Sequence, residues 1–246
     1  MLARLNTARG IVRSLRIYYG DRTRTLAMDR LYGHFARPGD LVFDVGAHVG
    51  DRVASFRRLG ARVVAVEPQP ALVRVLKLLY GRSSAVSIEA IAVGQRIGTV
   101  ELMLNVDNPT VSSASRAFVE SAQGAPGWEG QRWTSSIKVP MTTLDALISQ
   151  HGMPVFVKLD VEGFEANALA GLSQLVPALS FEFTTIQRDV ALACMERCIA
   201  LGYSRFNAAL GESQTFVCMD WVDASAITRW LYNLPHEANS GDIYAA

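Results

Sequence analysis

Short apolar runs alternate with segments of helical hydrophobic spacing through the first third of the chain. Each run is long enough for one buried strand, and glycine or proline residues separate the segments. Such an alternation is typical of a parallel sheet whose strands are joined by right-handed helical crossovers. We therefore predict strands at 41–45, 62–68 and 86–93, and helices at 50–59 and 70–80.

The alternation lapses in the middle of the chain. Segments 99–105 and 137–144 have strand character, and a stretch rich in Ser, Gly and Pro, 106–136, separates them. An apparent loop of that length inside a compact domain is usually functional or disordered. It also carries Trp128 and Trp133, whose large apolar area is uncommon in polar loops. We predict that 106–136 is a substrate-facing loop, and a loop tied down by its own aromatic residues is the alternative.

The strand and helix patterns return towards the C-terminus. The expected elements are a short helix at 144–150, a strand–turn–helix unit at 153–165, a strand at 177–183, a helix at 187–201, and hairpin strands near 205–210 and 214–220 joined at Gly211 and Glu212. Together with the first half, they predict one α/β domain spanning 38–246.

The segment before this domain, 1–37, has a helical pattern with breaks near Gly20 and Pro38. Its arginines interleave with leucine, isoleucine and valine, which makes a basic and weakly amphipathic helix. Such a helix can touch an anionic membrane surface, but it more often packs on its own domain with its arginines in water. The arginines concerned are Arg4, Arg9, Arg13 and Arg16.

Composition narrows the class of protein. Half of the 246 residues are hydrophobic and the formal net charge is +1, which gives no electrostatic case for a nucleic-acid partner. No apolar run is long enough to span a bilayer, and no signal-peptide pattern is present, so we expect a cytoplasmic protein. Cys194, Cys198 and Cys218 have no partner at metal-ligand spacing, so we expect reduced thiols.

The candidate ligand site begins at the first predicted strand. An apolar run ends in Asp44, and Gly46, His48 and Gly50 follow before a helical segment. This strand–turn–helix junction is where open α/β sheets bind nucleotide-like ligands. A carboxylate at the strand tip repels a pyrophosphate but attracts a cation, and His48 stands where a dinucleotide fold has its second glycine. The turn therefore favours a cationic nucleoside, and we predict S-adenosylmethionine.

The next two strands supply further candidate contacts. Glu67 ends the second strand, where an acid can accept hydrogen bonds from both ribose hydroxyls. A surface carboxylate before Pro68 is the alternative. In the third strand, Ala90 and Ile91 can flank an adenine ring, although core packing explains them equally well.

The segment 158–165 carries the remaining candidate chemistry. A lysine inside an apolar strand needs a partner, and Lys158 has Asp160 nearby and Glu182 at the end of a later strand. Asp160 and Glu162 leave the sheet at the edge that holds the glycine turn. An ion pair that only braces the turn is the alternative to a site role.

Transfer of a methyl group to a hydroxyl needs an aligned acceptor and is helped by a general base. The candidate bases are Asp160, Glu162, His48, and Lys158 if its pKa is depressed.

The chain resembles the FkbM family of S-adenosylmethionine-dependent methyltransferases. The motifs that carry the resemblance are FDVGAHVG at 43–50, VVAVEPQP at 63–70, AIAVG at 90–94, TTLDAL at 142–147, KLDVEGFE at 158–165, LSFEF at 179–183 and SGDIYA at 240–245. The resemblance implies a class I methyltransferase fold, Rossmann-like, with a mostly parallel seven-stranded sheet and an antiparallel last strand. It also implies O-methylation of a sugar, glycan or polyketide-type acceptor. The family commonly has Asn where this chain has His48.

By its match to the family's first motif, the resemblance implies that Asp44, Gly46 and Gly50 contact the cofactor and that Glu67 binds its ribose. The complete set of expected cofactor-binding residues is Asp44, Gly46, Ala47, His48, Gly50, Glu67, Pro68, Ala90, Ile91 and Asp160.

Two other functions compete with methyl transfer, namely a nicotinamide-dependent oxidoreductase and a non-catalytic binding protein. The absent second glycine and the lack of a recognisable hydride-transfer centre disfavour the oxidoreductase. Divalent metal dependence stays open, because Asp160 and Glu182 can form part of a metal site but no third ligand stands out. We therefore assign no metal-binding residue.

Overall fold

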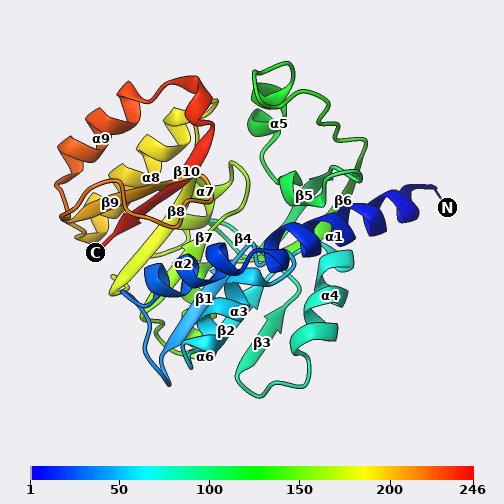
Figure 1. The fold of residues 1–246 in the computed structure, drawn as a ribbon, viewed down its shortest axis with the longest axis horizontal. Coiled ribbons are helices and arrows are strands. Elements are labelled where there is room, and N and C mark those ends of the chain that lie inside the picture. Colours follow the sequence, from blue (N-terminus) through cyan, green and yellow to red (C-terminus); the bar gives the residue numbers. More distant parts are fainter. Residues whose placement is uncertain (1) are drawn as a thin grey trace.

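The protein is described here from a computed structural model that covers residues 2–246, with side chains from Thr7 onwards. Its centre is a seven-stranded sheet (Figure 1). In spatial order the strands are β3 (Val86–Glu89), β2 (Arg62–Val66), β1 (Leu41–Val45), β7 (Phe156–Leu159), β8 (Ala178–Thr184), β10 (Ser240–Ala245) and β9 (Phe206–Leu210). The last strand in the chain, β10, pairs antiparallel with both β8 and β9, whereas β3, β2, β1, β7 and β8 are mutually parallel. This confirms the predicted sheet.

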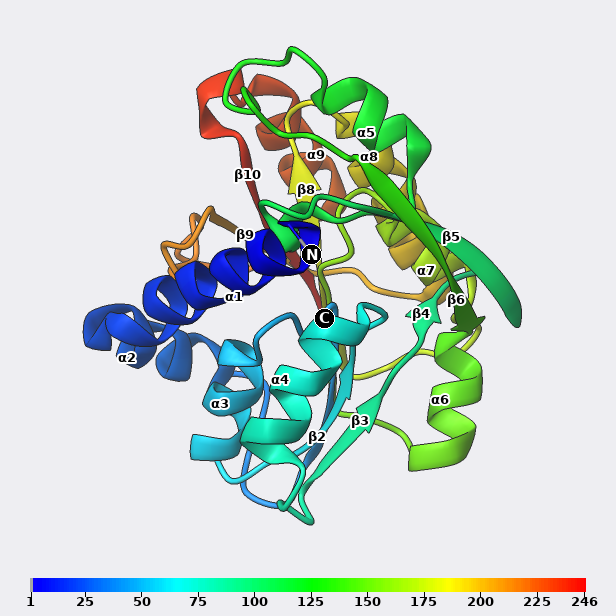
Figure 2. The same ribbon diagram turned by 90° about the vertical axis from the view of Figure 1, so that its right-hand side faces the viewer.

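Helices cover both faces of the sheet and make a three-layer sandwich (Figures 1 and 2). One core lies between the sheet and the helices α6 (Leu144–His151), α7 (Glu165–Ala170), α8 (Arg188–Leu201) and α9 (Ala224–Asn233). The other lies between the sheet and α2 (Arg22–Tyr32), α3 (Asp51–Arg58) and α4 (Pro70–Tyr80). The central strands are buried on both faces, which is why they read as continuous apolar runs.

Two sequence predictions about strands are wrong. The run expected as one strand at 86–93 divides into β3 and the short β4 (Ala92–Val93), because β4 turns away to pair with a second sheet. That sheet has the order β4, β6 (Ser135–Thr142), β5 (Gly98–Leu104). The expected terminal hairpin is also absent from the described chain: 214–220 makes only one isolated bridge to β9, between Phe216 and Ala209, and the strand that pairs with β9 is β10.

The middle segment, 106–136, folds around its own aromatic residues. It contains a 3-10 turn, η1 (Pro109–Val111), and a helix, α5 (Arg116–Ala122). Phe118 and Trp128 pack edge to face in a small core of their own, and the indole N–H of Trp133 donates to the carbonyl of Val111 at 2.8 Å. The aromatic residues therefore hold this segment in place beside the site described below.

The first helix, α1 (Leu2–Gly20), runs past α3 and α4 towards the 106–136 segment (Figure 2). Ser14 is buried against the domain, while Arg9, Arg13 and Arg16 are exposed. The side chain of Arg4 lies outside the described residues. The helix thus packs on its own domain, and contact of its arginines with a membrane surface stays a prediction. Within residues 2–246, no helix has the length and apolar character needed to cross a bilayer.

Candidate functional site

A pocket opens at the carboxyl ends of β1, β2, β7 and β8, with an empty volume of about 1080 Å³ that includes its open mouth. Acidic side chains dominate its charged lining, and Arg52 is the one lysine or arginine among the described lining residues. Such a surface repels phosphates and favours a cationic ligand. The acids are Asp51, Glu67, Asp160, Glu162, Glu182, Glu212 and Asp242.

The glycine turn after β1 forms one wall of the pocket. Gly46 has φ +86°, and a Cβ there would overlap the carbonyl oxygen of Asp160, so only glycine lets the two strand ends approach. The amides of Gly46 and Ala47 both donate to the carbonyl of Val66, at 2.9 and 3.0 Å. Gly50, with φ +82°, precedes α3 and leaves room for the side chains of Leu76 and Tyr80, which pack there from α4. These glycines therefore fix the position of the turn.

Asp44 lies at the tip of β1 but behind the pocket wall. Its side chain is fully buried, and neither carboxylate oxygen has a hydrogen-bond partner within the described part of the chain. Burial raises the pKa of Asp44 to about 7, against the opposing charges of Lys158 and Arg52. A nearby cation would stabilise a buried carboxylate that has no hydrogen-bond partner. Because Asp44 lies behind the pocket wall, it would act on a bound cation at a distance or through a water molecule.

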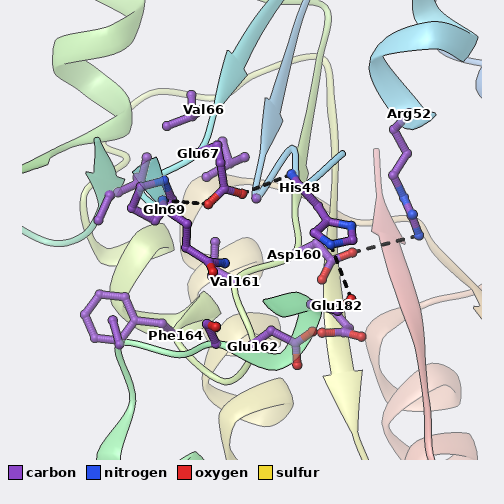
Figure 3. A pocket seen from close by; sticks show the side chains of 18 of the residues that line it. His48, Arg52, Val66, Glu67, Gln69, Asp160, Val161, Glu162, Phe164 and Glu182 are labelled. Carbon is purple, nitrogen blue, oxygen red and sulfur yellow. Dashed lines mark hydrogen bonds and ion pairs between the residues drawn. The ribbon is translucent and has the colours of Figure 1, made fainter. Parts of the chain in front are cut away.

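Glu67, at the end of β2, faces the pocket (Figure 3). Its carboxylate accepts the backbone N–H of His48 at 3.0 Å and that of Gln69 at 2.8 Å. Burial raises the pKa of Glu67 to about 7, although the two backbone hydrogen bonds act in the opposite direction. Each oxygen accepts one bond and keeps a second lone pair, so the carboxylate can still accept two ligand hydroxyls.

His48 adopts φ +49°, a left-handed conformation that Asn and His tolerate better than most residues. Its Nε2 lies 3.3 Å from the hydroxyl of Thr110, and the ring of Tyr18 packs against it edge to face at 5.6 Å. Burial lowers the pKa of His48 to about 4. The imidazole is therefore neutral at pH 7 and is held between α1 and the 106–136 segment.

Lys158 is fully buried and donates to Asp160 at 3.0 Å and to Asp242 at 3.1 Å. Burial alone would lower the pKa of Lys158, but the two carboxylates raise it well above its ordinary value. A general base at this position needs a depressed pKa, so the structure contradicts that role. The second partner is Asp242 on β10 instead of the expected Glu182, because β10 lies beside β8 and places Asp242 opposite Glu182.

Three acids converge beside Lys158. Asp160, Glu162 and Glu182 each offer a carboxylate oxygen, and these oxygens lie within 4.8 Å of one another (Figure 3). Burial acts to raise the pKa of Asp160, but Lys158 and Arg52 outweigh it and hold that pKa at about 2. Burial and the charge of Asp160 raise the pKa of Glu162 and Glu182 well above the usual value. Asp160 is thus ionised, whereas burial and the charge of Asp160 oppose ionisation of the other two.

The predicted cofactor residues divide into two groups. Asp44, Ala47, Gly50 and Ala90 are absent from the described pocket lining. The ones that do line it are Gly46, His48, Glu67, Pro68, Ile91 and Asp160.

Sequence reasoning missed several pocket residues. Arg52 is the second residue of α3 and pairs with Asp51 at 3.1 Å and with Glu212 at 3.2 Å. Tyr18 lines the pocket from α1, and its ring lies under the guanidinium of Arg24 at 4.8 Å. Arg52 directly follows the glycine turn, so its position in the sequence could have indicated a pocket residue. Nothing local in the sequence indicates that Tyr18 lines the pocket.

Comparison with known proteins relates this chain to a protein family. A family model described as "Methyltransferase FkbM domain" matches residues 44–213. No curated protein gives a significant match. The matched segment contains the glycine turn, Glu67 and the three converging acids, whereas Tyr18 and Asp242 lie outside it.

Solved structures similar to this chain include fibrillarin from Aeropyrum pernix with natively bound S-adenosyl-L-methionine, at 11% identity and TM-score 0.45, covering 90% of this chain and 74% of that one. Another is the 1,6-didemethyltoxoflavin N1-methyltransferase of Burkholderia thailandensis, at 12% identity and TM-score 0.43, covering 98% and 85%. A third is magnesium protoporphyrin IX methyltransferase from Synechocystis PCC 6803 with bound S-adenosylmethionine, at 11% identity and TM-score 0.44, covering 96% and 82%.

Proposed function

Because the chain belongs to the FkbM methyltransferase family and is an S-adenosylmethionine-dependent methyltransferase, we propose that it transfers the methyl group to a hydroxyl oxygen of a sugar, a glycan or a glycosylated or polyketide-type metabolite. The observation that carries this proposal is the acidic pocket at the carboxyl ends of the strands. Seven acids and one arginine suit a cationic sulfonium ligand, and they oppose the pyrophosphate of a nicotinamide cofactor. The oxidoreductase alternative therefore loses support.

The residues present fit S-adenosylmethionine. Glu67 would accept the ribose hydroxyls, and Pro68 and Ile91 would flank the adenine. The turn at Gly46 would pass under the ligand, with the partnerless carboxylate of Asp44 behind it. When bound, the sulfonium group supplies an activated methyl carbon for in-line transfer.

The chain's own residues would then hold the acceptor and take its proton. A hydroxyl must lie close to the methyl carbon and lose a proton as the new bond forms. His48 is neutral and unprotonated at pH 7, so it can accept that proton, although a pKa of about 4 makes it a weak base. Asp160 is ionised but weaker still as a base. Burial and the charge of Asp160 raise the pKa of Glu162, so its carboxylate is a stronger base than that of Asp160. The 106–136 segment contributes Thr110, Ser112 and Ala114 to the pocket lining. We therefore propose that this segment shapes the part of the pocket that binds the acceptor.

The cytoplasm is the proposed location. Cys194 and Cys198 are buried free thiols in α8, and Cys218 is also free. Reduced thiols of this kind are typical of cytoplasmic proteins.

The test combines binding with product analysis. Calorimetry should show binding of S-adenosylhomocysteine and none of NAD. Radiolabelled S-adenosylmethionine and a panel of monosaccharides, glycosides and oligosaccharides should yield an O-methylated product, located by mass spectrometry. The matched variants are His48→Asn, expected to lower turnover more than cofactor affinity, and Glu196→Gln, an exposed acid on α8 that should leave both unchanged. Binding of NAD alone, or methylation confined to nitrogen acceptors, would refute the proposal.

A further inference from the structure

The acids Asp160, Glu162 and Glu182 bring three carboxylates from two separate elements to one point. Asp160 and Glu162 leave the end of β7, and Glu182 is on β8. One oxygen from each lies within 4.8 Å of the others. Ligand oxygens around a hard divalent cation are separated by at most about 4.2 Å for Mg²⁺ and about 5 Å for Ca²⁺, because the metal–oxygen distances are roughly 2.1 and 2.3–2.6 Å. The 4.8 Å limit of the cluster is within the range for Ca²⁺, and the carboxylates would have to draw slightly closer together to hold Mg²⁺ or Mn²⁺.

A second observation separates this cluster from an ordinary group of surface acids. Glu162 is only 8% exposed, and no side-chain hydrogen bond or salt bridge to it exists among residues 7–246. The Oε2 atom of Glu182 has no accessible surface and no hydrogen-bond partner in the same part of the chain. Both carboxylates point towards Asp160 (Figure 3). Buried carboxylate oxygens without partners are costly, and a bound cation is one of the few ways to satisfy them.

The nearby cations of the protein do not fill this role. Lys158 donates its hydrogen bonds to Asp160 and Asp242, and to neither Glu162 nor Glu182 within the described residues. Arg52 reaches only Asp160, at 3.9 Å, and its shorter contacts go to Asp51 and Glu212.

The backbone holds Glu162 towards the cluster. Glu162 has φ +56°, and its carbonyl oxygen accepts the hydroxyl of Ser113 at 2.6 Å. One residue before it, the amide of Val161 donates to Glu165 at 2.8 Å. The turn is thus fixed on both sides, so its carboxylate is prearranged.

We propose that Asp160, Glu162 and Glu182 bind one hard divalent cation, Mg²⁺ or Mn²⁺, in the pocket. Its role rests on the proposed function: a hydroxyl oxygen of the acceptor that coordinates the cation becomes more acidic and loses its proton more readily to the base. Carboxylates and hydroxyls are the ligands that such cations prefer. An acceptor with two adjacent hydroxyls, as sugars have, would fit the ligand positions left open by three carboxylates.

The experiment measures the binding of the metal ion alone, without cofactor or acceptor. Chelator-treated protein is titrated with Mn²⁺ and followed by calorimetry and by the loss of the free-ion electron paramagnetic resonance signal. We expect one Mn²⁺ per chain, and at least tenfold weaker binding in Glu162→Gln and in Glu182→Gln. Glu196→Gln, an exposed acid on α8, should bind as the wild type does.

Thermal unfolding in the absence of metal is the control for correct folding. The two Gln variants should be at least as stable as the wild type, because each removes a carboxyl group from a crowded set, and only the wild type and Glu196→Gln should gain stability with Mn²⁺. No Mn²⁺ binding by the wild type at millimolar concentration, or unchanged binding in both Gln variants, would overturn the proposal. So would competition between Mn²⁺ and S-adenosylhomocysteine, because the cluster would then hold the cofactor's charged groups.

The two proposals fail separately. S-adenosylhomocysteine binding and O-methyl transfer that persist undiminished in a chelator would reject the metal site and leave the proposed function intact. Mn²⁺ binding without any methyl transfer to hydroxyl acceptors would do the reverse.

Discussion

Replacing Glu67 by Gln should weaken cofactor binding by about 10- to 100-fold. The side chain keeps its size but loses its charge and one of its two acceptor oxygens. In the wild type each oxygen already accepts one backbone N–H, from His48 and from Gln69. The amide retains one oxygen for these donors and for the ribose hydroxyls together, so at least one ribose hydrogen bond is lost. A hydrogen bond to a charged acceptor is worth about 1.5–3 kcal/mol, and about 1.4 kcal/mol corresponds to a factor of ten.

The assay is calorimetric titration with S-adenosylhomocysteine at pH 8, with thermal unfolding of both proteins as the folding control. The dependence on pH gives an independent check. Because burial raises the pKa of Glu67 to about 7, the wild-type carboxylate gains a proton as the pH falls through 7, and its affinity should fall there. The Gln variant lacks this component, so its pH dependence should be shallower. A folded Glu67→Gln protein with less than threefold loss of affinity at pH 8 would refute the assignment of Glu67 to the ribose.

Three further substitutions test other parts of the site. Tyr18→Ala should weaken S-adenosylhomocysteine binding several-fold in calorimetry, because it removes a ring from the pocket lining, whereas Tyr18→Phe should not; equal affinity in all three proteins would exclude α1 from the site. Lys158→Met should cost about 3–5 kcal/mol in urea unfolding, since it leaves the buried Asp242 and the partly buried Asp160 without their cation, and adding Asp242→Asn should recover part of that loss. Gly46→Ala should fail to give a folded protein by circular dichroism, because its methyl group would overlap the β7 end; a native-like spectrum would show that the turn can move.

The sequence was sufficient for the parts of the fold whose cause is local. The strand before the glycine turn is buried on both faces, so it appears as a continuous apolar run, and the turn needs glycine at φ +86° whatever lies around it. Glu67 could be placed because it follows the next such run directly. One local signal was overlooked: α9 has Ile227 and Leu231 buried four residues apart, and Asp223 caps it by accepting the amide of Ala226.

Pairings between segments that are far apart in the chain could not be predicted from the sequence. The strand-like run at 214–220 was expected to pair with β9, but it makes only one isolated bridge there, and the strand that pairs with β9 is β10, which pairs with β8 as well. The place of β10 beside β8 also brings Asp242 into contact with Lys158, which is 84 residues away in the sequence. Charge alone cannot choose between Asp242 and Glu182 as the partner, because only the order of strands places one of them within reach.

The walls of the pocket come from three separate stretches of the chain. The segment 44–213 provides the glycine turn and six of the seven acids, α1 adds Tyr18, and β10 adds Ser240, Gly241 and Asp242. The shared motifs and the flanking walls can therefore change independently during evolution, and relatives that share the motifs can take acceptors of different shape. Exchanging α1 between two such relatives would then change the wall that carries Tyr18, and with it both cofactor affinity and the shape offered to the acceptor.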